Sequence, residues 1–187
     1  GNCLMRLGSA EEGQQALDTF RLLSVQVEQI TRLERLTAAD ASSSATWAEL
    51  GGVRLARGEW GLAAVAFENA GAWSHADGTD AAAAVGYGER LGYAYFRLAR
   101  YHDAAAVFAV VVELAPDVAA YRNSLAGAYL MSEDAARAVE QYLAAVALAP
   151  SDARLRMNLA QAYEQAGQEG EAAAARAAHA RLVGQEE

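Results

Sequence analysis

Identical side chains recur every 34 residues in the second half of this chain, and that spacing limits its possible folds more than any other feature. Three columns share the period: Leu91, Leu125 and Leu159; Tyr95, Tyr129 and Tyr163; and Ala104, Ala138 and Ala172. A fixed period of roughly 20 to 50 residues is the signature of a repeat protein, in which one supersecondary unit is copied along the chain. We therefore expect a stack of similar units.

An earlier unit follows the same columns after a longer shift. Leu50 and Gly51 precede Leu91 and Gly92 by 41 residues instead of 34. The difference implies seven inserted residues, which we place at 78–84. This insertion is expected to form either a flexible loop or one extra helical turn.

Each unit contains two segments in which large apolar residues lie three or four positions apart, the spacing of an amphipathic helix. In the unit after the insertion we expect helices at 85–98 and 103–114. Pro116 and Pro150, the only two prolines, follow the second segment of successive units. Proline ends a helix because its ring has no N–H to donate and disfavours the α conformation of the preceding residue. The sequence therefore predicts an all-α chain of helical hairpins.

The columns carry a known motif, Trp-x2-Leu-Gly-x2-Tyr followed by Ala-x3-Phe and Pro. The matching residues are Trp47, Leu50 and Gly51; Leu91, Gly92 and Tyr95; Ala63 and Phe67; Ala104 and Phe108; and Pro116. In these residues the chain resembles the tetratricopeptide repeat family. The resemblance implies a right-handed α-α superhelix, a solenoid of stacked hairpins. It places one solenoid over residues 1–187, with complete units at 44–77, 85–118, 119–152 and 153–186.

The N-terminal segment departs from the period. Residues 1–27 fit the latter part of another unit, with Gly8, Gly13, Leu17 and Phe20 on its columns. No proline follows Phe20, and apolar residues continue at helical spacing, so we expect this helix to run to about Thr37 and a linker to reach residue 43. Because the chain starts without Met inside an expected helix, we expect an upstream portion, which could include a removed leader. The compartment stays open, with the cytoplasm as the working expectation.

Chemically reactive residues are few and scattered. His75, His102 and His179 fall in different units, without a neighbouring cysteine or carboxylate pair at ligand spacing. Cys3 is the only cysteine, which leaves no thiolate cluster and no internal disulfide. No phosphate-binding glycine loop is present, because the glycines of 86–92 lack the strand and the lysine that such loops require. We expect a non-enzyme without metal or cofactor.

Charge and composition narrow the partners. The net charge is -9, and all 15 basic residues are arginine. Nucleic-acid binding relies on a basic face that displaces counterions from phosphates, so we expect no nucleic-acid partner. No apolar run approaches the roughly 20 residues that span a bilayer, so we expect no membrane insertion. The alanine- and arginine-rich composition favours a bacterial source.

The resemblance implies that the first helix of each unit lines a concave groove that binds a peptide or protein segment. The expected groove residues are Leu55, Glu89, Tyr93, Phe96, Arg97, Asn123, Leu130, Met131, Arg154, Met157 and Gln161. Most are apolar, and the arginines among them could meet a carboxylate. We therefore expect a protein-interaction scaffold.

Two other functions stay open at this stage. The partial first unit, with Leu4, Leu7 and Leu17, could pair with its copy in a homodimer, which would make the chain a homo-oligomerisation module. Alternatively, the chain could be a non-catalytic regulatory domain of a larger enzyme that lies upstream.

Overall fold

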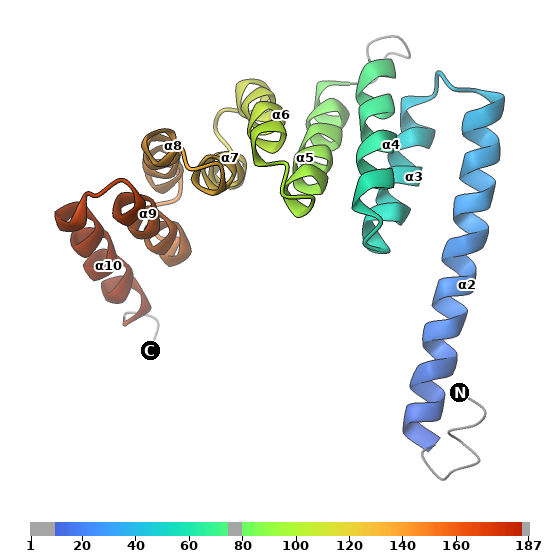
Figure 1. Ribbon diagram of the computed structural model, residues 1–187, viewed down its shortest axis with the longest axis horizontal. Coiled ribbons are helices and arrows are strands. Elements are labelled where there is room, and N and C mark those ends of the chain that lie inside the picture. Colours follow the sequence, from blue (N-terminus) through green and yellow to red (C-terminus); the bar gives the residue numbers. More distant parts are fainter. Residues whose placement is uncertain (1–9, 75–79, 185–187) are drawn as a thin grey trace. The chain divides into compact units, whose positions relative to one another are not determined.

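The computed structural model describes residues 10–74 and 80–184, and within these ranges the secondary structure is helical, without a β-strand (Figure 1). The chain is all-α, as predicted. The described helices are α2 (Ala10–Ala39), α3 (Ser44–Ala56), α4 (Trp60–Trp73), α5 (Ala81–Arg97), α6 (Tyr101–Leu114), α7 (Ala119–Met131), α8 (Ala135–Leu148), α9 (Ala153–Gln165) and α10 (Glu169–Val183).

The chain divides into two compact units, residues 1–77 and residues 78–187, and the boundary falls at the predicted insertion. Helix α5 begins at Ala81, four residues before the predicted start at residue 85. Asp80 caps the helix, because its side chain accepts a hydrogen bond of 2.7 Å from the backbone N–H of Ala83. Part of the insertion is therefore one extra helical turn.

In the first unit, α2 is a single helix that ends at Ala39, two residues beyond the expected end at about Thr37. Its C-terminal part packs against α3, where Ile30 and Leu33 contact a cluster that includes Leu50. Glu34 also accepts a hydrogen bond of 2.6 Å from Arg54 of α3.

Phe20, which the sequence places on the same column as Phe67, is not buried. Phe20 is 68% exposed, whereas Phe67 of α4, on the same column, is 0% exposed. The physical reason is that α3 packs against α2 at Ile30 and Leu33, about three to four helical turns beyond Phe20. Gly8, the first member of the same partial unit, lies outside the described residues.

The second unit consists of successive helix pairs, α5 with α6, α7 with α8, and α9 with α10 (Figure 1). Neighbouring pairs also pack on each other, through α6 with α7 and α8 with α9. Proline occupies the connection after α6 and after α8, as predicted.

The turn inside every hairpin uses one residue in the left-handed region. These residues are Gly58 (φ 74°), Ala99 (φ 58°), Glu133 (φ 65°) and Gly167 (φ 73°). The backbone N–H of the following residue returns to a carbonyl of the first helix, as in the 2.9 Å bond from Arg100 to Tyr95. This is a helix C-cap that satisfies carbonyls left open at the helix end.

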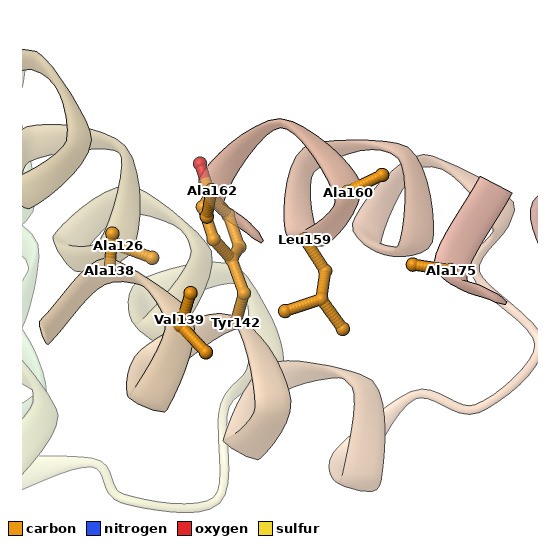
Figure 2. Close-up of a cluster of buried hydrophobic side chains, with 8 residues drawn as sticks. All are labelled: Ala126, Ala138, Val139, Tyr142, Leu159, Ala160, Ala162 and Ala175. Carbon is orange, nitrogen blue, oxygen red and sulfur yellow. The ribbon is translucent and has the colours of Figure 1, made fainter. Parts of the chain in front are cut away.

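Small residues let the helices of the second unit approach closely. Ala138 of α8 and Ala126 of α7 are both 0% exposed and lie in one cluster with Tyr142 and Leu159 (Figure 2). The alanine column of the sequence is thus the contact line between paired helices, and the larger residues fill the space between successive pairs.

Candidate functional site

Two neighbouring pockets lie on the second unit, and the first helices of its hairpins contribute to both. The first, here called the Tyr142 pocket, has a volume of about 220 Å³. Its lining comes from α5, α6, α7 and α8: Tyr93, Phe96, Phe108, Asn123, Ser124, Gly127 and Tyr142. The second, here called the Asn158 pocket, measures about 370 Å³. Its lining is Ala119, Ala120, Asn123, Asp152, Arg154, Leu155 and Asn158.

Aromatic side chains on α5 form one wall of the Tyr142 pocket, and neighbouring groups hold them in place. The Phe96 ring meets the Tyr101 ring edge-on, with centroids 5.3 Å apart. The Tyr93 hydroxyl accepts a hydrogen bond of 3.0 Å from Arg97, whose guanidinium carbon also lies 5.8 Å from the centre of the tyrosine ring. The wall is therefore preorganised by ring packing and by a cation near the ring face.

Tyr142, on α8, also lines this pocket. The residue is 4% exposed, and its ring stands beside Leu159 in the core cluster (Figure 2). Its hydroxyl lies close to Gly127, because a Cβ atom added there would be 3.6 Å from the hydroxyl oxygen. Burial raises the pKa of Tyr142 from 10.0 to about 12, so the phenol is neutral at physiological pH and can both donate and accept.

Asn123 of α7 belongs to both pockets and connects them. Its side-chain oxygen accepts a hydrogen bond of 2.9 Å from Asn158 of α9, 35 residues away. In the Asn158 pocket, Arg154 pairs with Asp152 at 3.3 Å, and this hydrogen bonding lowers the pKa of the Asp152 carboxyl. The Arg154 side chain is 89% exposed. The Asn158 pocket is thus polar, whereas the Tyr142 pocket is mainly aromatic.

The structure brings together four of the predicted groove residues. Tyr93, Phe96 and Asn123 share the Tyr142 pocket, and Asn123 and Arg154 share the Asn158 pocket. Arg97 stands beside Tyr93, as described above.

The remaining predicted residues line neither pocket. Leu130 packs against the core cluster, and Met131 at the end of α7 is 48% exposed. Glu89 and Gln161 are exposed and Met157 is half-buried. Leu55 is half-buried on α3 and belongs to the first unit. Their place in a groove stays a prediction.

Sequence reasoning missed nine lining residues: Phe108, Ala119, Ala120, Ser124, Gly127, Tyr142, Asp152, Leu155 and Asn158. The sequence does contain a signal for Tyr142, because it is the tyrosine in a column whose earlier members, Phe67 and Phe108, are phenylalanine. Gly127 gave no such signal, since a glycine inside a helix does not reveal whether the space beside it is open.

Groups suited to metal or membrane chemistry are absent from the described ranges. No cluster of three or more His, Cys, Asp or Glu side chains occurs among residues 10–74 and 80–184. In the same ranges no helix combines the length and the apolar character that a bilayer crossing demands. His102 is exposed and His179 contacts the Ala153 carbonyl at 2.9 Å, while Cys3 and His75 fall outside the described residues.

The helices form hairpins that share the same type of turn, and successive hairpins pack on each other. This arrangement defines a helical-repeat protein with the tetratricopeptide repeat fold. No protein-family model and no curated protein sequence matches the chain. Solved structures do match. A crystal structure of MamA is similar with a TM-score of 0.75 and 18% identity, over 90% of this chain and 95% of that one.

Two further solved structures share the fold. MamA residues 41-end from Desulfovibrio magneticus RS-1 matches with a TM-score of 0.74 and 18% identity, over 100% of this chain and 92% of that one. YrrB, described as a TPR protein with an unusual peptide-binding site, matches with a TM-score of 0.74 and 15% identity, over 88% of this chain and 81% of that one. The recognition of a tetratricopeptide repeat architecture from the sequence is thereby confirmed.

Proposed function

We propose that this protein is an interaction scaffold whose second unit binds a peptide or protein segment along α5, α7 and α9. The observation that carries the proposal is the Tyr142 pocket, an aromatic recess of about 220 Å³ built by side chains of four helices. When a peptide binds along the surface of a protein, recesses of this kind each accept one of its side chains and so determine which sequences bind.

The surroundings of the recess suit a polypeptide backbone. Asn123 and Asn158 place side-chain amides next to the aromatic recess, and amides can both donate to and accept from peptide groups. Arg97 and Arg154 add two guanidinium groups on the same unit, which favours a segment with carboxylates near its apolar anchor. YrrB, of similar fold, is described as having a peptide-binding site, which agrees with this use of the fold.

The proposal assigns no catalysis to this chain. The lining residues of the two pockets are aromatic, aliphatic, amide, hydroxyl and glycine residues, with a single Asp–Arg pair at 3.3 Å. That set contains no nucleophile beside a base, which acid–base or covalent catalysis needs.

A peptide-display selection against the full chain tests the proposal. We expect a set of related sequences with one apolar or aromatic anchor, and we expect Phe96→Asp to lose them, because a carboxylate would replace an aromatic wall of the pocket. Val110→Asp is the matched control, because Val110 lies on α6, is 54% exposed and lines neither pocket. Equal recovery by both variants, each shown to be folded by circular dichroism, would remove the site assignment.

A second candidate function is self-association through α2. Four apolar residues on this helix are at least half exposed: Phe20 (68%), Leu22 (58%), Val25 (52%) and Val27 (50%). Phe20 and Val27 lie on one face of the helix, with Leu22 and Val25 on the opposite side, and exposed apolar residues of this kind favour an interaction surface on α2. Leu4 and Leu7, the other residues predicted for a dimer contact, lie outside the described residues, and the described Leu17 is half-buried.

Sedimentation velocity over a wide concentration range tests this second candidate. Self-association through α2 predicts a dimer that Phe20→Glu dissociates and that Phe96→Asp leaves intact. A monomer at every concentration contradicts it. The third alternative, a regulatory domain of a larger enzyme, stays a prediction that the upstream coding sequence would test.

A further inference from the structure

One column of the repeat carries a hydroxyl group where its other buried members have none. Phe67 and Phe108 are 0% and 3% exposed, and Tyr142 takes the equivalent place in the next hairpin at 4% exposed. The hydroxyl of Tyr142 makes no hydrogen bond to the described residues. The hydroxyl oxygen is not one of the fully buried polar atoms that lack a partner, so it is open to the pocket, where phenylalanine at this position would present no polar group.

The hydroxyl is oriented toward open space. It lies beside Gly127, where the missing side chain leaves the Tyr142 pocket unfilled, and a Cβ atom there would be 3.6 Å from the oxygen. The other pocket walls near it are the rings of Tyr93, Phe96 and Phe108. A group that enters the recess therefore meets aromatic rings on its sides and one unpaired hydroxyl at its end.

Two further polar groups stand on α7 at the same recess. Ser124 already donates to the Ala120 carbonyl at 3.1 Å, and the Asn123 oxygen already accepts from Asn158. The Tyr142 hydroxyl makes no bond to the described residues, so it can both donate to and accept from a group that enters the pocket.

The size of the recess limits its occupant to a single ring. A cavity of about 150 Å³ holds one benzene molecule, and the Tyr142 pocket measures about 220 Å³. A ring with one small polar substituent fits this volume, and a charged group is disfavoured because the pocket offers no opposite charge among its lining residues.

We infer that the Tyr142 pocket recognises a tyrosine side chain of the bound segment, with its ring among the three aromatic rings and its hydroxyl bonded to the hydroxyl of Tyr142. The inference rests on the proposed function, because the ligand is the same segment, and it names the residue that anchors it. Phenylalanine is the poorer occupant, since its ring would displace water from the Tyr142 hydroxyl without replacing the hydrogen bond. The preference for tyrosine over phenylalanine therefore depends on two oxygen atoms, the hydroxyl oxygen of the bound tyrosine and that of Tyr142.

Two small probes test this preference on the full chain. N-acetyl-tyrosinamide and N-acetyl-phenylalaninamide differ only in that oxygen, and nitrogen-15 NMR follows the backbone amide of Ser124, which lines the pocket and is unchanged in every variant, during titration with each. We expect the tyrosine probe to bind the wild type about fivefold more tightly, the ratio that one neutral hydrogen bond supplies. In Tyr142→Phe, which keeps the ring and the fold, we expect the two affinities to agree within about twofold.

Gly127→Leu is the second variant, because its side chain fills the recess while leucine suits a helix better than glycine does. We expect it to bind neither probe. The inference is overturned if the wild type binds both probes equally, prefers the phenylalanine probe or binds neither, or if the tyrosine preference survives in Tyr142→Phe.

The two proposals fail in different ways. If displayed peptides are recovered, are lost with Phe96→Asp and yet show no tyrosine preference, the scaffold function stands and the tyrosine inference falls. If no peptide is recovered while the tyrosine probe binds as expected, the pocket stands as a phenol site and the peptide-binding function falls.

Discussion

The ring of Phe108 lies directly against Gly92, so closely that a Cβ atom added to this glycine would be 2.7 Å from the ring. The contact joins α5 to α6 inside one hairpin, and Phe67 approaches Gly51 in the same way, at 2.9 Å, between α3 and α4. The Leu-Gly pair of the sequence motif therefore has a physical cause, because the glycine makes room for the aromatic residue of the second helix.

Replacing Gly92 by alanine should destabilise the protein. The added methyl group would force the Phe108 ring to move, and overpacking of this kind costs about 1–3 kcal/mol, partly offset by the better helix propensity of alanine. Gly86→Ala is the matched control, because it lies on the same helix with nothing within 4 Å of the added atom. We expect the control to stabilise the protein by about 0.5–1 kcal/mol in urea unfolding. Equal effects of the two substitutions would contradict the role of this contact.

Replacing Glu133 by glycine should stabilise the protein. Glu133 has φ 65° in the turn between α7 and α8. In two other hairpins the equivalent position of the turn is a glycine, Gly58 or Gly167. A left-handed conformation costs a non-glycine residue about 1–2 kcal/mol. Glycine avoids this cost, but its greater conformational entropy in the unfolded chain offsets about half of the gain in stability. We expect a net gain of about 0.5–1 kcal/mol by thermal unfolding.

The comparison for this turn is Glu140→Gly, in the exposed middle of α8. That substitution should cost about 1 kcal/mol, because glycine is a poor helix former. A loss of stability in both variants would show that the backbone conformation at Glu133 is not the cause.

Ionisation of Tyr142 should occur at unusually high pH. Its pKa is raised from 10.0 to about 12 because burial disfavours the phenolate. The folded state thus holds its proton longer than the unfolded state does, so the stability contributed by Tyr142 is complete below pH 10 and is lost as the pH rises through about 12. The difference in tyrosinate absorbance between wild type and Tyr142→Phe isolates this group, and a midpoint near 10 would contradict its burial.

The hydrogen bond between Asn123 and Asn158 should couple two neighbouring hairpins. The bond is 2.9 Å long and joins α7 to α9. A double-mutant cycle with Asn123→Ala and Asn158→Ala should give a coupling free energy of about 0.5–1.5 kcal/mol. Asn123→Ala with Gln161→Ala is the reference pair, since Gln161 is an exposed residue of α9, and we expect its coupling to be near zero.

Most of the fold could be predicted from the period. The equal spacing of Leu, Tyr and Ala columns fixes which residues share an environment, and Ala104, Ala138 and Ala172 are all 0% exposed. Phe20 matches its column by residue type, but it is 68% exposed, because the contact of α2 with α3 lies further along the helix, at Ile30 and Leu33. Column matching is reliable where both helices of a hairpin are present.

The candidate site was only partly predictable, because a pocket depends on residues from several helices. Tyr93, Phe96 and Asn123 were found through the positions that the resemblance assigns to the first helix. Tyr142 comes from a second helix, and Gly127 matters through the side chain that it lacks. Neither contribution follows from the pattern of one helix alone.

The most direct test of the central claim measures the affinity of a display-selected, fluorescently labelled peptide for three folded proteins by anisotropy. If the segment is held at the Tyr142 pocket, Gly127→Leu should weaken binding at least about tenfold, the size of effect expected for blocking a central anchor. Val110→Asp, on α6 and outside the pocket, should stay within about twofold of the wild type. Unchanged binding by Gly127→Leu, or a greater loss in Val110→Asp, would contradict the account.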